Sequence, residues 1–335
     1  MPDIPPTNAE RNSRVVFQGE NRPWRCARRI SGGRTLVLGA MATAQLPTAQ
    51  PAGYGQYVLT LSCPDRPGIV HAVAAYLHHA GGSIADSQQF GDPYSGHFFM
   101  RVHAQMTRPC DLDELRTGFA AVAEEFGMDW QLNDVTQRHR VLIMVSQHGH
   151  CLNDLLFRTE TGDLPIDVVA VVSNHATFAG LARWHGIGFH HVPVDLENRQ
   201  EAEQRLLKIV AEQNVDLVVL ARYMQILSPE LCEELAGRAI NIHHSFLPSF
   251  KGARPYHQAH TRGVKLIGAT AHYVTSVLDE GPIIEQEIAR VDHGYTPDRL
   301  VAVGRDVECL ALARAVRWHV ERRVLINGGR TVVFR

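Results

Sequence analysis

The chain has 335 residues, of which 45% are hydrophobic and 20% are charged. These proportions are ordinary for a globular enzyme, and the length suggests about two domains. A formal net charge of −2 argues against binding to the phosphate backbone of nucleic acid, which depends on clustered lysine and arginine. The longest apolar runs are strand-sized, well short of the roughly 18 residues that a membrane span requires. We therefore expect a cytoplasmic protein that binds neither nucleic acid nor a membrane.

The cysteines favour a reducing compartment. They are widely spaced and include no C-x-x-C pair, so they indicate neither a disulfide framework nor a zinc site. The six positions are Cys26, Cys63, Cys110, Cys151, Cys232 and Cys309.

Residues 1–54 differ in composition from the rest of the chain. They are rich in proline, and seven arginines face three acidic residues before Met41. No amphipathic helix and no apolar core of a secretion signal emerge from this pattern. We expect a disordered N-terminal extension, and Met41 is a second candidate start position.

Residues 55–135 predict a small domain with a ferredoxin-like order of elements. A strand from residue 56 leads through a Pro/Gly turn into a helix whose apolar residues recur at helical spacing. Two strands at 83–90 and 97–103 follow, joined by a hairpin-like loop. A helix at 111–126 and a strand at 129–133 complete a β-α-β-β-α-β unit.

The turn that precedes the first helix carries a resemblance to a known family. Its sequence, DRPGIV at 65–70, resembles the ACT domain, a small-molecule-sensing module often fused to metabolic enzymes. The resemblance implies an amino-acid effector near Asp65, Pro67, Gly68 and Ile69, at an interface between domains, and we expect a homo-oligomer. A turn that serves only as scaffold is the alternative.

Residues 140–335 predict a second domain with a Rossmann-like, mainly parallel sheet. Near-continuous apolar runs at 141–146, 166–172 and 216–221 alternate with helical stretches at 152–160, 177–184 and 202–213. Such sheets bind ligands at the carboxyl ends of their strands. The first strand-to-helix turn, SQHGHCLN at 146–153, has a single glycine and no phosphate-binding pattern, which argues against a dinucleotide cofactor.

One stretch of this domain concentrates an amide, an imidazole and a carboxylate. Asn241 and His243 follow Ile240 with a spacing of two, so at a strand end both side chains would point to one face. Asp279 follows a β-rich run at 271–277 and precedes the turn sequence Glu-Gly-Pro. Together these groups can stabilise an oxyanion and transfer protons. The histidine spacing matches no zinc signature, so we expect no metal.

Three separated motifs resemble the formyltransferase fold family: LARYMQILSP at 220–229, NIHHSFLPSF at 241–250 and HYVTSVLDEGP at 272–282. With the ACT-like domain in front, residues 56–335 resemble the formyltetrahydrofolate deformylase family. The resemblance implies hydrolysis of 10-formyltetrahydrofolate by water, with Asn241, His243 and Asp279 as catalytic residues. It also implies a role in supplying formate and balancing folate pools for purine synthesis, and no cofactor beside the folate substrate.

The resemblance further places the pterin of the folate against residues of two of these motifs. The residues expected to bind the substrate are Met224, Gln225, Ile226, Leu227, Val274 and Thr275. His244 joins them as a contact to substrate or water, although strand alternation would turn it away from His243 if the strand continued.

Two other functions remain open at this stage. The same motifs serve formyl transfer to an amine such as glycinamide ribonucleotide, but the turn at 146–153 offers no glycine-rich cradle for a phosphorylated acceptor. A non-catalytic amino-acid sensor is an alternative of another class. The presence of Asn241, His243 and Asp279 together argues against it.

Overall fold

A computed structural model describes residues 54–335, apart from residue 196 and residues 248–254. The predicted disordered extension lies outside the described residues except for its last residue, Tyr54. The described residues form a four-stranded sheet, a seven-stranded sheet and a two-stranded hairpin. An antiparallel α/β unit followed by a mainly parallel sheet confirms the expected fold class. None of the described helices is long and apolar enough to cross a membrane.

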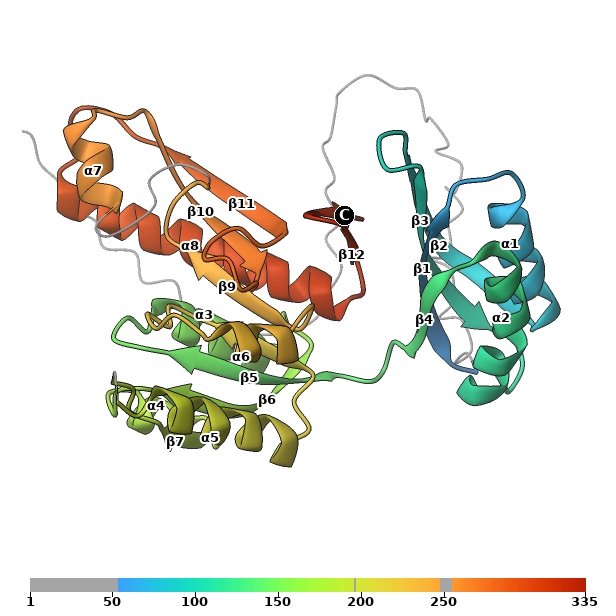
Figure 1. The fold of residues 1–335 in the computed structure, drawn as a ribbon, viewed down its shortest axis with the longest axis horizontal. Helices are drawn as coiled ribbons and strands as arrows, with labels where there is room; N and C mark the ends of the chain where they lie inside the picture. Colours follow the sequence, from blue (N-terminus) through green and yellow to red (C-terminus); the bar gives the residue numbers. More distant parts are fainter. Residues whose placement is uncertain (1–53, 196, 248–254) are drawn as a thin grey trace, which may run out of the picture. The chain divides into compact units, whose positions relative to one another are not determined.

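The first sheet is antiparallel, with the strand order β2-β3-β1-β4 (Figure 1). Its elements follow the predicted β-α-β-β-α-β order: β1 (Gln56–Pro64), α1 (Ile69–His79), β2 (Gly82–Asp92), β3 (His97–Met106), α2 (Leu112–Phe126) and β4 (Asp129–Asp134). Helix α2 begins after Asp111, whose carboxylate accepts hydrogen bonds from two backbone N–H groups, and is followed by Gly127 with φ 63°. Phe119 of α2 and Val73 of α1 are fully buried against the sheet, so this unit has a core of its own.

The second sheet has the strand order β11-β10-β9-β8-β5-β6-β7, and its strands β5 to β9 run parallel. The two remaining strands, β10 and β11, are antiparallel to their neighbours. The strands are β5 (His139–Val145), β6 (Ile166–Ser173), β7 (Gly188–His191), β8 (Leu217–Leu220), β9 (Ala239–His243), β10 (Leu266–Tyr273) and β11 (Ile283–Arg290).

Helices cover both faces of this sheet. They are α3 (His150–Glu160), α4 (Ala179–Trp184), α5 (Arg199–Glu212), α6 (Pro229–Glu234), α7 (Pro255–Thr261) and α8 (Pro297–Val320). The chain continues into the hairpin of β12 (Val324–Asn327) and β13 (Arg330–Val333).

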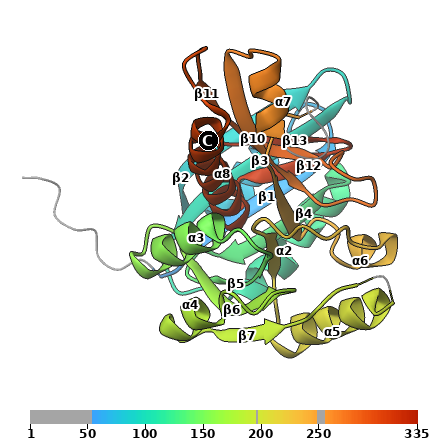
Figure 2. The same ribbon diagram turned by 90° about the vertical axis from the view of Figure 1, so that its left-hand side faces the viewer.

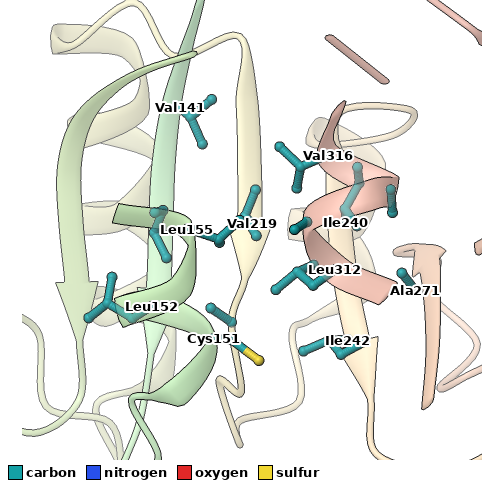
Figure 3. Close-up of a cluster of buried hydrophobic side chains, with 14 of the residues drawn as sticks. Val141, Cys151, Leu152, Leu155, Val219, Ile240, Ile242, Ala271, Leu312 and Val316 are labelled. Carbon is teal, nitrogen blue, oxygen red and sulfur yellow. The ribbon is translucent and has the colours of Figure 1, made fainter. Parts of the chain in front are cut away.

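Strand β5 lies inside the sheet, between β8 and β6, and is buried on both faces, which explains its near-continuous apolar sequence. Val141 packs with residues of α3 and α8, whereas the next residue, Leu142, packs on the opposite face with residues of α5 and α6. Figure 2 shows β5 and β6 between α3 and α4 on the left and α5 on the right. The close-up in Figure 3 shows Val141 with Leu155 of α3 and Leu312 of α8.

Candidate active site

A cavity of about 230 Å³ lies beyond the carboxyl ends of β8 and β9. This is the edge at which an open α/β sheet is expected to bind its ligand. The three predicted catalytic residues, Asn241, His243 and Asp279, all line it. The predicted substrate-binding residues line the same cavity: Met224, Gln225, Ile226, Leu227, His244, Val274 and Thr275. Residues from three separate sequence segments therefore meet at one place.

Strand pairing sets the orientation of Asn241. Its partner on the antiparallel strand β10 is His272, and the Asn241 Nδ2 donor lies 3.3 Å from the His272 Nε2 atom. The His272 Nδ1–H donates to the carbonyl oxygen of Tyr273 at 2.9 Å. Burial lowers the pKa of His272, so its neutral ring keeps a lone pair on Nε2 that can accept from the amide. One amide N–H of Asn241 is thus held by His272, and the other can point to a substrate oxygen.

His272 is a site residue that the sequence analysis did not assign to the chemistry. It belongs to a recognised motif, but its contact with Asn241 depends on the register of β10 against β9. That register joins positions 31 residues apart. The only local indication of a role for His272 was its place in a β-rich run, seven positions before Asp279.

The Asp279 carboxylate meets His243 at the cavity. Asp279 Oδ1 lies 3.1 Å from His243 Nδ1 and 3.8 Å from His272 Nε2. Burial by itself would raise the pKa of Asp279, but the hydrogen bond and charge of His243 outweigh it and hold the pKa below its ordinary value. The His243 side chain is 7% exposed, and its Nε2 atom has no hydrogen-bond partner among the described residues. That atom is available to a substrate.

A tight loop returns Asp279 to the sheet. Strand β10 ends at Tyr273, before the end of the β-rich run expected at 271–277, and the Thr275 hydroxyl donates to the Val277 carbonyl oxygen within the loop. Asp279 itself has a left-handed backbone, with φ 58°. A Cβ atom on Gly281 would lie 1.8 Å from the Tyr273 carbonyl oxygen, so this close approach requires glycine.

His244 shares the cavity with His243. Strand β9 ends at His243, so the alternation that would turn His244 to the other face does not extend to it. The centres of the two rings are 5.2 Å apart. Burial, reinforced by the charge of Arg222, lowers the pKa of His244 to about 4. At neutral pH its ring is uncharged and can accept a hydrogen bond from water.

The loop after β8 supplies an apolar wall. Met224 and Ile226 are 54% and 61% exposed, so they are not part of the hydrophobic core. The backbone N–H of Met224 donates to the Ser146 hydroxyl at 3.0 Å, and that hydroxyl donates to Asn174 Oδ1 at 2.7 Å. These bonds tie the wall to the first strand-to-helix turn. Exposed apolar side chains on an anchored backbone suit a flat heteroaromatic ring.

In the described part of the chain, one group has metal-ligand atoms within mutual reach: His150, Cys151 and Glu308, within 4.8 Å. Both Glu308 oxygens already accept hydrogen bonds, from His150 and from Tyr256. The hydrogen bonds therefore account for this cluster without an ion.

The ACT-like turn lies in the first unit. Asp65, Pro67 and Gly68 are exposed, and Gly68 precedes α1 with φ 102°. Ile69 is only 2% exposed and packs in the core of this unit. Its side chain therefore supports the fold, and of the predicted effector-binding residues only the other three present side chains or backbone to solvent.

Comparison with known families assigns both parts of the chain. Residues 57–109 match the ACT domain, and residues 139–316 match the Formyl transferase family. The protein therefore has an ACT domain followed by a formyl transferase domain, and the latter contains the cavity with Asn241, His243 and Asp279.

Relatives with both domains narrow this class. The chain is 56% identical over 281 residues to a formyltetrahydrofolate deformylase of Corynebacterium sp. (strain P-1), covering 84% of this chain and 98% of that protein. It matches the crystal structure of formyltetrahydrofolate deformylase from Burkholderia mallei with a TM-score of 0.81 and 54% identity, over 84% of this chain and 100% of the other. The chain belongs to the formyltetrahydrofolate deformylase family.

A glycinamide ribonucleotide transformylase from Symbiobacterium toebii is a more distant structural neighbour. It matches with a TM-score of 0.55 and 32% identity, over 59% of this chain and 95% of its own. This chain is thus similar in fold to a protein named as a glycinamide ribonucleotide transformylase.

Proposed function

We propose that this chain hydrolyses 10-formyltetrahydrofolate to formate and tetrahydrofolate, with water as the formyl acceptor and with Asn241, His243 and Asp279 as catalytic residues. The observation that carries the proposal is the 3.1 Å contact between Asp279 and His243 beside an Asn241 amide that His272 orients. The kinship with formyltetrahydrofolate deformylases supports the choice of substrate.

Each group has a role that its surroundings support. A formamide is a poor electrophile, so the reaction needs donors where the formyl oxygen becomes negative. We assign this role to the N–H of Asn241 that His272 does not hold and to the His243 ring, and their position on the cavity wall supports the assignment. The low pKa of Asp279 keeps it ionised, as a base or an orienting group requires.

Proton transfers through Asp279 and His243 accompany the bond changes. The water oxygen bonds to the formyl carbon while Asp279 accepts one water proton. The bond between the formyl carbon and N10 breaks as His243 delivers a proton to N10. Formic acid leaves as formate after losing its remaining acidic proton, and the proton on Asp279 passes to the neighbouring His243. The products are formate, tetrahydrofolate and one proton.

Water as the acceptor is supported by the first strand-to-helix turn. The turn has a single glycine, and its surroundings are crowded: a Cβ atom on Gly149 would lie 2.3 Å from the Phe178 ring, and the His150 side chain bonds to the buried Glu308. A phosphorylated amine would need open backbone N–H groups at such a turn. Water as the acceptor needs no phosphate-binding turn.

Formate release in the absence of an acceptor tests the proposal. The full chain is incubated with 10-formyltetrahydrofolate alone, and formate is measured with a coupled dehydrogenase. Formate equal to the tetrahydrofolate formed is expected. Turnover that begins only after an amine acceptor is added would contradict hydrolysis, and binding of an amino acid with no turnover under either condition would favour a sensor.

The proposal extends to the setting of the enzyme. Formate production and control of folate pools for purine synthesis follow from the reaction. The cysteines among the described residues are free thiols, and none of the described helices could span a membrane. Both observations are consistent with the proposed cytoplasmic location. The ACT domain is proposed to bind an amino-acid effector through the exposed turn at Asp65, Pro67 and Gly68, in a homo-oligomer. Met224, Gln225, Ile226, Leu227, Val274, Thr275 and His244 are proposed to contact the substrate.

A further inference from the structure

Arg222 is a buried cation in the cavity with unused hydrogen-bond donors. It follows β8 and lines the same cavity as His243 and His244. Its side chain is 10% exposed, and its Nε and Nη1 atoms have no hydrogen-bond partner within the described ranges. Buried polar groups nearly always have partners, because leaving one unpaired costs free energy. Unused donors on a cavity wall therefore indicate a ligand with acceptor atoms.

The neighbouring carboxylate does not use these donors. Glu308 Oε2 lies 3.4 Å from Arg222 Nε, but that oxygen accepts from His150 Nε2 at 2.7 Å. The other oxygen accepts from the Tyr256 hydroxyl at 2.7 Å. Burial would raise the pKa of Glu308, yet the His150 bond, the Arg222 charge and the Tyr256 bond hold it below its ordinary value. Glu308 thus anchors the guanidinium by charge at its Nε side and leaves Nη1 without a hydrogen-bond partner in the described part of the chain.

The backbone of Arg222 is itself in an uncommon conformation. Its φ is 65°, in the left-handed region that glycine adopts without strain. The peptide is held by the hydrogen bond from Ser146 N–H to the Arg222 carbonyl oxygen at 3.3 Å. A non-glycine residue in this conformation costs free energy, which the surrounding structure must offset, and such residues concentrate at functional sites. This observation is independent of the unused donors and points to a contribution from the side chain.

The position of Arg222 places it at the reacting end of the cavity. After burial, its charge is the largest cause of the low pKa of His244. The apolar wall proposed for the pterin starts two residues later, at Met224. A guanidinium that is only 10% exposed suits a small anion better than the long, doubly charged glutamate of a folate, which requires open solvent at its end.

We propose that Arg222 forms the binding site for formate, the anionic product. This inference rests on the proposed hydrolysis, which makes formate beside His243. The planar guanidinium carries five N–H donors and can meet both oxygens of a carboxylate. Formate is the smallest carboxylate and matches the little space around a buried side chain. Glu308 is the positioning residue that holds the guanidinium toward the cavity.

Formate binding without turnover tests this site separately from the reaction. Saturation-transfer NMR on the formate proton measures binding of sodium formate to the full chain, with sodium chloride at equal ionic strength as the reference. The variants are Arg222→Gln, which removes the charge, and Arg222→Lys, which keeps the charge but loses the planar fork. Arg238→Gln is the matched control, because Arg238 donates to Val215 and Glu234 carbonyl oxygens away from the cavity.

We expect wild type and Arg238→Gln to bind formate equally. Arg222→Gln should bind it about 10- to 100-fold more weakly, with Arg222→Lys between them. The inhibition constant of formate during hydrolysis should rise by the same factor. Wild type that hydrolyses the substrate but shows no formate signal would overturn the formate site and leave the hydrolase proposal intact. Formate binding that depends on Arg222, in a chain that does not hydrolyse the substrate, would support the formate site and contradict the hydrolase proposal.

Two further results would also count against the site. Loss of the Arg222 charge beside the buried Glu308 can destabilise Arg222→Gln, so circular dichroism is recorded for each variant. If Arg222→Gln is unfolded, Arg222→Lys carries the comparison. Folded Arg222 variants with unchanged formate binding would overturn the proposal. So would a rise in KM for polyglutamylated substrate with no change in formate inhibition, because it would assign the guanidinium to the folate tail.

Discussion

Replacement of Asp279 by asparagine is the sharpest test of the active site. The Asp279 side chain is 12% exposed, and its Oδ1 atom lies 3.1 Å from His243 Nδ1. Asparagine has nearly the same size and can still accept a hydrogen bond through its side-chain oxygen. The substitution therefore removes the negative charge and the capacity to take a proton while it preserves the shape of the loop.

The expected loss follows from the two roles of the carboxylate. A positioned acid or base contributes a factor of about 10²–10⁴ to the rate. A hydrogen bond to a charged group contributes about 1.5–3 kcal/mol, which corresponds to about 10- to 150-fold if it acts only by orienting His243. We expect kcat to fall by about 10²–10⁴ with KM nearly unchanged, because the pterin wall is untouched. A fall nearer tenfold would assign Asp279 to orientation alone.

The assay is formate release from 10-formyltetrahydrofolate, with the exposed carboxylate Asp306 of α8 as the control. Asp306→Asn makes the same chemical change outside the cavity and should keep full activity. Circular dichroism and folate binding establish that Asp279→Asn is folded. A folded Asp279→Asn enzyme with wild-type kcat would refute the catalytic assignment, and gross unfolding would reassign the residue to structure.

Three other outcomes are expected. His272→Phe keeps the ring but removes the acceptor for the Asn241 amide, so kcat should fall about tenfold at constant KM, and an unchanged kcat would show that the amide needs no support. Gly281→Ala places a methyl group against the Tyr273 carbonyl oxygen and should lower the free energy of unfolding by about 3 kcal/mol in a urea titration; a stable variant would contradict the close approach. The pKa of His244 falls from 6.5 to about 4 on folding, so the unfolded chain binds the proton more readily. Stability should therefore decrease as pH falls from 6.5 to about 4, by about 3 kcal/mol, and His244→Gln should remove that part of the pH dependence when urea titrations are compared across this range.

Much of the fold and part of the site were predictable from local patterns. Apolar runs at strand length and at helical spacing predicted the elements of both domains, because burial repeats with the period of each backbone conformation. The spacing of two between Asn241 and His243 placed both on one face of a strand end, and β9 does end at His243. Motifs of this kind are local, so they are legible in a single sequence.

The partners of these residues were decided by tertiary structure. His272 meets Asn241 only because β10 pairs antiparallel to β9 in one register, and a shift by one residue would turn His272 to the other face. Helix α8 brings Glu308 within 3.4 Å of Arg222, although 86 positions separate them along the chain. Contacts over such separations depend on the packing of whole elements, which no local pattern encodes. The sequence by itself determined the candidate catalytic residues, whereas folding determined which groups orient them and left Arg222 with donors for an anion.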